Sequence, residues 1–148
     1  MWGFLIALLS GALMSIQGVF NTGVTKEAGT WMAAGFVQVT AFLTCVVAWF
    51  ISGREGSIGS LFHIESKYML LGGVIGAFIT FTVIQAIGKI GPAGATMLIV
   101  AAQLTTAYLI ELFGLFGTEK AEFSWRKLIG VCVMAAGIFL FQGMEWKK

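Results

Sequence analysis

One acid lies inside an otherwise apolar stretch of this sequence. Glu111 is the only charged residue in the run from Gly91 to Gly117, which is long enough to cross about 30 Å of hydrocarbon as a helix. Inserting a carboxyl group there costs at least about 2.5 kcal/mol on insertion scales, so such a residue marks a functional site by default. We therefore expect Glu111 to bind a proton or a cation. The alternative is an acid that reaches interfacial water or pairs with a nearby lysine or arginine.

Uncharged polar side chains accompany this acid. Gln103 lies eight residues before Glu111, near the same helix stripe, and Thr106 follows it. Because a helix rises 1.5 Å per residue, four further amides fall toward one side of the membrane, namely Gln17, Asn21, Gln38 and Gln85. We expect all seven residues to bind a solute or ion. The structural alternative is that the amides hydrogen-bond between helices, which stabilises membrane proteins by about 0.6 to 2 kcal/mol per bond.

The sequence carries no pattern typical of an enzyme or of a bound cofactor. It contains no Asp, a single histidine in a polar connector (His63), and two cysteines, Cys45 and Cys132, in apolar runs where thiols behave as small hydrophobes. Neither metal-ligand spacing nor a glycine-rich phosphate loop is present. We expect no enzyme activity, no metal and no cofactor.

Composition indicates which elements position these side chains. Hydrophobic residues make up 58% of the 148 residues and charged residues 11%, and the mean hydropathy is +0.92, whereas soluble proteins average about 25% charged residues. A domain of this size cannot bury so much apolar surface, so lipid must cover the remainder. The net charge of +2 is too small to indicate a nucleic-acid partner.

Five apolar runs predict an all-α integral membrane protein with a single five-helix domain over residues 1–148. The predicted spans are 2–20, 31–51, 68–87, 93–116 and 125–142, separated by polar connectors at 21–30 and 52–67, a tight turn at 88–92 and a charged linker. An odd number of spans places the termini on opposite sides of the membrane. Tryptophans, which settle at the membrane–water interface, lie at or near the ends of the runs: Trp2, Trp31, Trp49, Trp125 and Trp146.

Basic residues are almost evenly divided between the two sides of the predicted bundle. Five lie on the N-terminal side (Arg54, Lys67, Lys120, Arg126, Lys127) and four on the other (Lys26, Lys89, Lys147, Lys148). An excess of Lys and Arg in cytoplasmic loops normally sets orientation. The balance therefore predicts dual topology and an antiparallel homodimer, which would supply the inverted repeat that larger secondary transporters carry in one chain. The alternative is simply a weak orientation signal in a small protein.

Glycine spacings predict close packing of helices in such an assembly. The pairs are Gly11 and Gly18, Gly72 and Gly76, and Gly130 and Gly137.

Two blocks of sequence resemble a known family. The segment 11–21, GALMSIQGVFN, and the residues 102–130, with AQL, IELFGLFG and SWRKLIG, resemble the YdcZ-type inner-membrane exporters of the drug/metabolite transporter superfamily. The resemblance spans nearly the whole chain and implies a bacterial inner-membrane location, a five-helix unit like half of a ten-helix superfamily member, and transport. The related small multidrug resistance proteins use a glutamate in their first helix, where this chain has Gln17, so their mechanism does not carry over intact.

These observations together favour a secondary transporter. We expect a homodimer that moves a small polar or amphiphilic solute by alternating access, with proton or cation coupling at Glu111. The rival interpretation is a non-transporting assembly or regulatory subunit, or one chain of a heterodimeric transporter, in which the polar residues only join helices. A passive channel is disfavoured because no ring of like charges lines any predicted helix.

Overall fold

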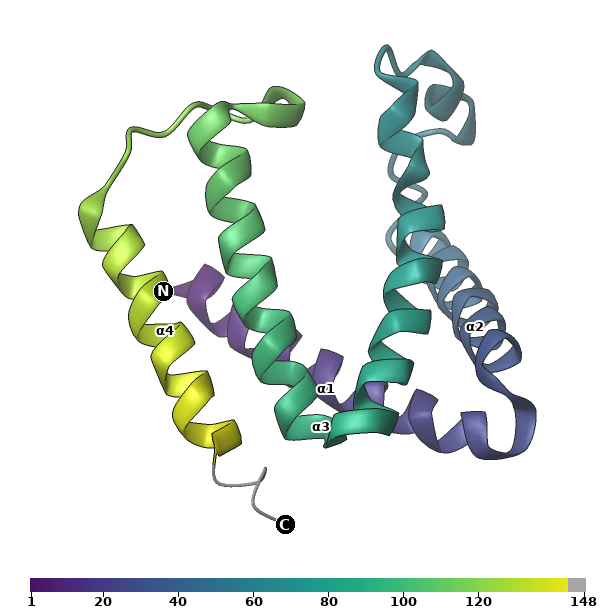
Figure 1. Cartoon of the computed structure of the whole chain (residues 1–148). Coiled ribbons are helices and arrows are strands. Elements are labelled where there is room, and N and C mark those ends of the chain that lie inside the picture. The colour runs from purple at the N-terminus through teal and green to yellow at the C-terminus, as the bar shows by residue number, and fades with distance from the viewer. Residues whose placement is uncertain (144–148) are drawn as a thin grey trace. The chain divides into compact units, whose positions relative to one another are not determined.

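The computed structural model describes residues 1–143, and that part of the chain contains helices and no strand (Figure 1). The α-helices are α1 (Trp2–Ala28), α2 (Thr30–Ile51), α3 (Gly72–Phe113) and α4 (Trp125–Gly143). Short 3-10 helices, η1 (Ile58–His63), η2 (Lys67–Leu71) and η3 (Leu115–Gly117), lie in the connectors. The predicted all-α class is confirmed. Trp146, predicted to lie at the membrane interface, and Lys147 and Lys148, counted among the basic residues, lie outside the described residues.

The predicted connector at 21–30 is wrong in its extent. α1 continues through these polar residues to Ala28 and ends at Gly29, whose φ is 78°. The hydroxyls of Thr22 and Thr25 donate to carbonyl oxygens one turn back in the same helix, at 2.8 and 2.9 Å. Polar side chains are thus satisfied within the helix, and the helix ends at a glycine that adopts positive φ without steric cost.

α3 contains a break near its middle. Its 42 residues would extend about 63 Å as one helix, roughly twice the hydrocarbon thickness of a bilayer. The backbone leaves the helical conformation at Gly91, with φ 75° and ψ 164°, directly before Pro92. This break lies in the predicted turn at 88–92, so α3 consists of two helical segments.

The chain divides into two compact units, Met1–Lys89 and Ile90–Lys148. The first unit contains α1, α2 and residues 72–89 of α3, and the second contains the remainder of α3 with η3 and α4. In the first unit, Ala33, Ala34 and Ile84 form a buried apolar cluster between α2 and α3. Small alanines allow α2 to approach Ile84 closely, because they place little volume between the helices.

Two further contacts hold the helices of the first unit together. Trp31 of α2 stacks on Phe81 of α3 with ring centroids 4.2 Å apart. Gly18 of α1 faces Ile87 so closely that a Cβ atom at this position would lie 2.6 Å from the Ile87 Cδ1. Gly18 therefore allows close packing at one of the six glycines in the predicted pairs. A Cβ atom at Gly11, Gly72, Gly130 or Gly137 would meet nothing within 4 Å in the described chain, so close packing at these positions stays a prediction.

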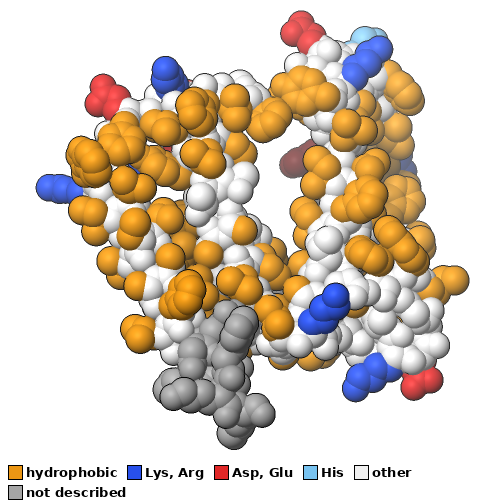
Figure 2. Space-filling model, viewed as in Figure 1, with side chains coloured by type: hydrophobic (Ala, Val, Ile, Leu, Met, Phe, Trp, Pro, Cys, Tyr) orange, Lys and Arg blue, Asp and Glu red, His pale blue; other side chains and the backbone are white. Residues whose placement is uncertain are grey.

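Hydrophobic side chains cover the flanks of the helices, and charged side chains gather near the helix ends (Figure 2). Three helices of the described chain are long and apolar enough to cross a membrane: Trp2–Ala28, Thr30–Ile51 and Lys67–Phe113. Exposed apolar flanks are what lipid-facing helices require, since lipid offers no hydrogen-bond partners. The count of five crossings, their topology and the dimer remain predictions.

Candidate functional site

Glu111 is paired with a lysine of the next helix. It lies two residues before the end of α3, and its Oε2 accepts a hydrogen bond from Lys127 Nζ, near the start of α4, at 2.9 Å. Both side chains are half exposed, at 50% each. A bond between two charged groups at this distance is among the stronger hydrogen bonds in proteins. Of the alternatives left open for Glu111, the structure shows pairing with a nearby basic residue.

Tyr108 completes this arrangement. It lies three residues before Glu111 and therefore on the same helix face. Tyr108 is buried, and its hydroxyl accepts a hydrogen bond from the Ser124 backbone N–H at 3.0 Å. Lys127 Nζ lies 5.3 Å from the centre of the Tyr108 ring, within the range of a cation–π contact. Lys127 thus has two partners, a carboxylate and an aromatic face.

A cavity of about 440 Å³ opens beside the ion pair. Most of its wall is apolar, and its polar groups come from Tyr108, Glu111 and Lys127. The remaining lining residues come from α3 and α4: Leu104, Ala107, Gly130, Val131 and Met134. Binding pockets are typically apolar with a few convergent polar groups, and this cavity has that character.

Three predicted site residues are exposed and do not line this cavity. The side chains of Gln17, Gln103 and Thr106 are exposed, and none of them forms a hydrogen bond within the described part of the chain. They are therefore available to water, to a solute or to another chain. Their role in binding remains a prediction.

Two of the four amides of the first unit, Gln38 and Gln85, have threonine partners. Gln38 Nε2 donates to Thr80 Oγ1 at 3.2 Å, and Gln85 Nε2 donates to Thr30 Oγ1 at 3.1 Å. Asn21 is buried, with 8% of its surface exposed. No hydrogen bond joins two of the four predicted amides among the described residues. The hydrogen bonds of Gln38 and Gln85 join two helices, as expected if these amides only hold helices together. A role of the amides in binding remains a prediction.

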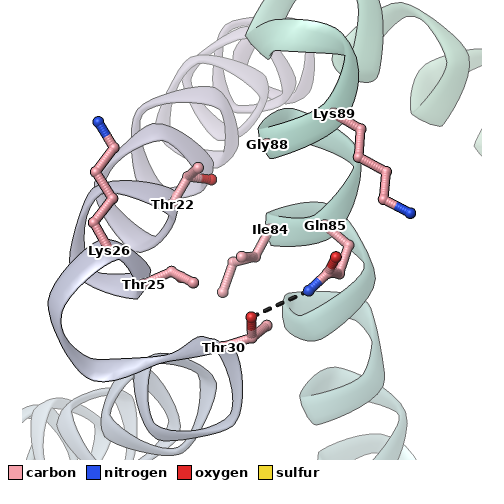
Figure 3. A pocket seen from close by; sticks show the side chains of 8 residues that line it. All are labelled: Thr22, Thr25, Lys26, Thr30, Ile84, Gln85, Gly88 and Lys89. Atoms are coloured by element: carbon pink, nitrogen blue, oxygen red, sulfur yellow. Dashed lines mark hydrogen bonds between the residues drawn. The ribbon is translucent and has the colours of Figure 1, made fainter.

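A second cavity, of about 340 Å³, lies at the end of the first unit where α1 ends and α2 begins (Figure 3). Gln85 is the only predicted site residue in its lining. The others are mainly threonines and lysines: Thr22, Thr25, Lys26, Thr30, Ile84, Gly88 and Lys89.

The polar neighbours of Glu111 and Gln85 were not predicted from the sequence to bind a ligand. Tyr108 could have been found from its spacing of three before Glu111, and Thr22 from its spacing of four before Lys26. No sequence spacing relates Lys127 or Ser124 to α3. The conformation of the connector between α3 and α4 decides which residues reach Glu111 and Tyr108.

Comparison with known proteins agrees with the resemblance. Residues 2–140 match the family described as "Putative inner membrane exporter, YdcZ". The chain is 25% identical to the "Inner membrane protein YdcZ" of Escherichia coli (strain K12) over 142 residues, which cover 93% of this chain and 91% of that protein. No solved structure matches the chain significantly. A family of exporters consists of transporters rather than enzymes, and the apolar helices fit its inner-membrane location. The chain belongs to the YdcZ family of inner-membrane proteins.

Proposed function

We propose that the protein is a subunit of a secondary transporter that moves a small polar or amphiphilic solute across the inner membrane by alternating access. Membership in a family described as exporters supports transport. The observation that carries the proposal is the Glu111–Lys127 pair at the edge of a largely apolar cavity. Such a cavity offers an apolar wall to the body of a solute and two opposite charges to its polar group.

The ion pair also offers a route to coupling. A proton that binds Glu111 removes the negative charge from the pair and leaves Lys127 with the Tyr108 ring, 5.3 Å away. The cavity then carries net positive charge, which changes its affinity for a charged or dipolar solute. Because linkage is reciprocal, a solute that binds the protonated form more tightly raises proton affinity by the same factor.

A second copy of the chain would complete the pathway. The exposed side chains of Gln17, Gln103 and Thr106 have no partner in the described part of the chain, and we propose that they face a polar route within a homodimer. The near-equal division of basic residues favours an antiparallel pair, in which each leaflet receives the same set of groups.

The experiment that tests this proposal measures proton movement in proteoliposomes. Vesicles that contain a trapped pH dye are challenged with a panel of small polar and amphiphilic metabolites, and solute-driven proton flux is recorded for the wild type, Glu111→Gln and Glu119→Gln. Glu119 lies in the connector outside the cavity, so its variant controls for loss of an acid. We expect flux in the wild type and in Glu119→Gln, and little or none in Glu111→Gln.

Equal flux in all three proteins would remove Glu111 from the coupling mechanism. Absence of flux and of uptake for every metabolite in the wild type would favour the non-transporting subunit instead.

A further inference from the structure

We propose that the cavity at the end of the first unit binds a phosphate ester that carries neighbouring hydroxyl groups. This site is separate from the Glu111 cavity, and the proposal does not depend on transport. All of its lining residues belong to the first unit, so a single chain forms it. Two lysines, three threonines and a glutamine line this cavity of about 340 Å³, with Ile84 as its buried apolar residue. The ammonium ends of Lys26 and Lys89 point away from its middle in Figure 3.

The charge of the lining favours an anion. Lys26 of α1 and Lys89 of α3 lie on opposite sides of the cavity (Figure 3), and no acidic residue lines it. Neither ammonium forms an ion pair with a carboxylate among the described side chains. Free four-carbon stems allow both ammonium groups to turn over the cavity. Two such charges match a phosphate monoester, which carries about −1.5 to −2 at neutral pH.

The uncharged groups favour hydroxyls beside that phosphate. Thr22 and Thr25 donate their hydroxyl protons to carbonyl oxygens of their own helix, so their lone pairs remain as acceptors. Thr30 accepts from Gln85, which leaves the Thr30 hydroxyl proton free to donate. The site therefore combines donors for an oxyanion with acceptors for the hydroxyl groups of the same ligand.

Two sources share this chemistry. Glycerol phosphate is a small free solute with a phosphate monoester, and the same glycerol and phosphate groups form the head of phosphatidylglycerol, where the phosphate is a diester with a single negative charge. The cavity lies where α1 ends and α2 begins, which is the level at which a head group meets a membrane helix. The test therefore needs a soluble arm and a lipid arm.

The soluble arm measures binding of glycerol 3-phosphate to detergent-purified protein by calorimetry, with glycerol as the uncharged probe. We expect saturable binding of the phosphate and none of glycerol. Lys26→Gln and Lys89→Gln should each weaken binding about tenfold, since each removes a charged hydrogen-bond donor. Gln85→Glu should abolish binding, because it places a negative charge in the cavity at almost unchanged volume. Lys67→Gln, which removes a lysine of the same unit that does not line the cavity, is the matched control.

The lipid arm repeats the titration in phosphatidylcholine vesicles with and without phosphatidylglycerol. If the head group is the natural occupant, phosphatidylglycerol competes with glycerol 3-phosphate in the wild type, and the Lys26→Gln/Lys89→Gln double variant retains less of this lipid through purification. If the free solute is the occupant, the lipid leaves its affinity unchanged. Either result supports the site.

Two outcomes overturn the proposal. One is equal binding of glycerol 3-phosphate by the wild type and the double variant. The other is no binding in detergent combined with equal retention of phosphatidylglycerol by both proteins. Because binding in detergent does not require transport, absence of proton flux in proteoliposomes leaves this inference standing, and loss of anion binding leaves the proposed transport standing.

Discussion

At the scale of residues, the surroundings of Glu111 explain how a carboxylate is held near the end of an apolar helix. Lys127 supplies a charged hydrogen-bond donor at 2.9 Å, and the Tyr108 ring provides a second contact for the same ammonium. Glu111 lies near the end of α3, so the pair is half exposed and is not isolated in the apolar interior. Glu111 is therefore accessible from outside the described chain, while the cavity beside it is largely apolar.

The hydrogen bond between Gln38 and Thr80 tests whether the predicted amides stabilise the packing of the helices. Its amide donates to Thr80 at 3.2 Å and it lines neither cavity described here. In a double-mutant cycle of Gln38→Leu and Thr80→Val, we expect a coupling free energy of about 0.6 kcal/mol, the average for interhelical bonds in membranes. The measurement is unfolding in mixed micelles. Additive effects of the two changes would show that this bond does not stabilise the protein.

Single residues were predicted from the sequence to different degrees. Glu111 was identified because its charge contrasts with the apolar residues around it, and it borders a cavity. Gln85 also lines one. Lys127, Lys26 and Lys89 were counted only as orientation signals, because a lysine near a helix end looks the same in sequence whether it faces water or a binding site. The distinction depends on which helices meet.

At the scale of elements, apolar runs predicted the helices well where conformational signals agreed with polarity. The predicted runs 31–51 and 125–142 correspond to α2 and α4 within one residue at each end. The prediction failed at 21–30, where the chain is polar but nothing interrupts helical geometry before Gly29. Gly91 and Pro92 give the opposite case, since they interrupt α3 within a long apolar sequence. Backbone conformation, rather than polarity, sets these helix ends.

The close packing of α1 on α3 at Gly18 can be tested by substitution. A Cβ atom there would lie 2.6 Å from Ile87 Cδ1 and 3.4 Å from Val83 Cγ1, whereas one at Gly11 would meet nothing within 4 Å. We expect Gly18→Leu to destabilise the packing of α1 on α3 by about 1 to 3 kcal/mol, as overpacking typically does. Gly11→Leu is the matched control, and its unfolding free energy should stay near the wild-type value. Equal stability of the two variants would show that α1 does not pack on α3 at Gly18.

At the scale of the whole molecule, the two units raise the question of how one short chain builds a pathway. Each unit has its own cavity, one bordered by lysines and threonines and the other by an ion pair. The exposed apolar flanks indicate that lipid or a second copy covers most of the surface. Sequence predicted this membrane character from composition alone, whereas assembly depends on contacts that a single chain does not contain.

Dual topology is a prediction about the whole chain in its membrane. With five basic residues on one side and four on the other, C-terminal fusions to alkaline phosphatase and to green fluorescent protein should both be active. Lys89→Gln changes the division to five against three, so the N-terminal side should prefer the cytoplasm and phosphatase activity should rise. Lys67→Gln, which makes the division even, should not raise it. Fusions active on one side only would contradict dual insertion.

The central claim is that polar side chains of the second half of α3 face water inside the membrane. Its most direct test uses protein in which Cys45 and Cys132, both exposed, are replaced by alanine, reconstituted in vesicles. A membrane-impermeant maleimide is then applied to Gln103→Cys and, as control, to Leu109→Cys, an exposed apolar position in the same helix. We predict rapid labelling at position 103 and slow labelling at position 109. Equally slow labelling at both positions would indicate a dry helix bundle and would contradict the proposed transport pathway.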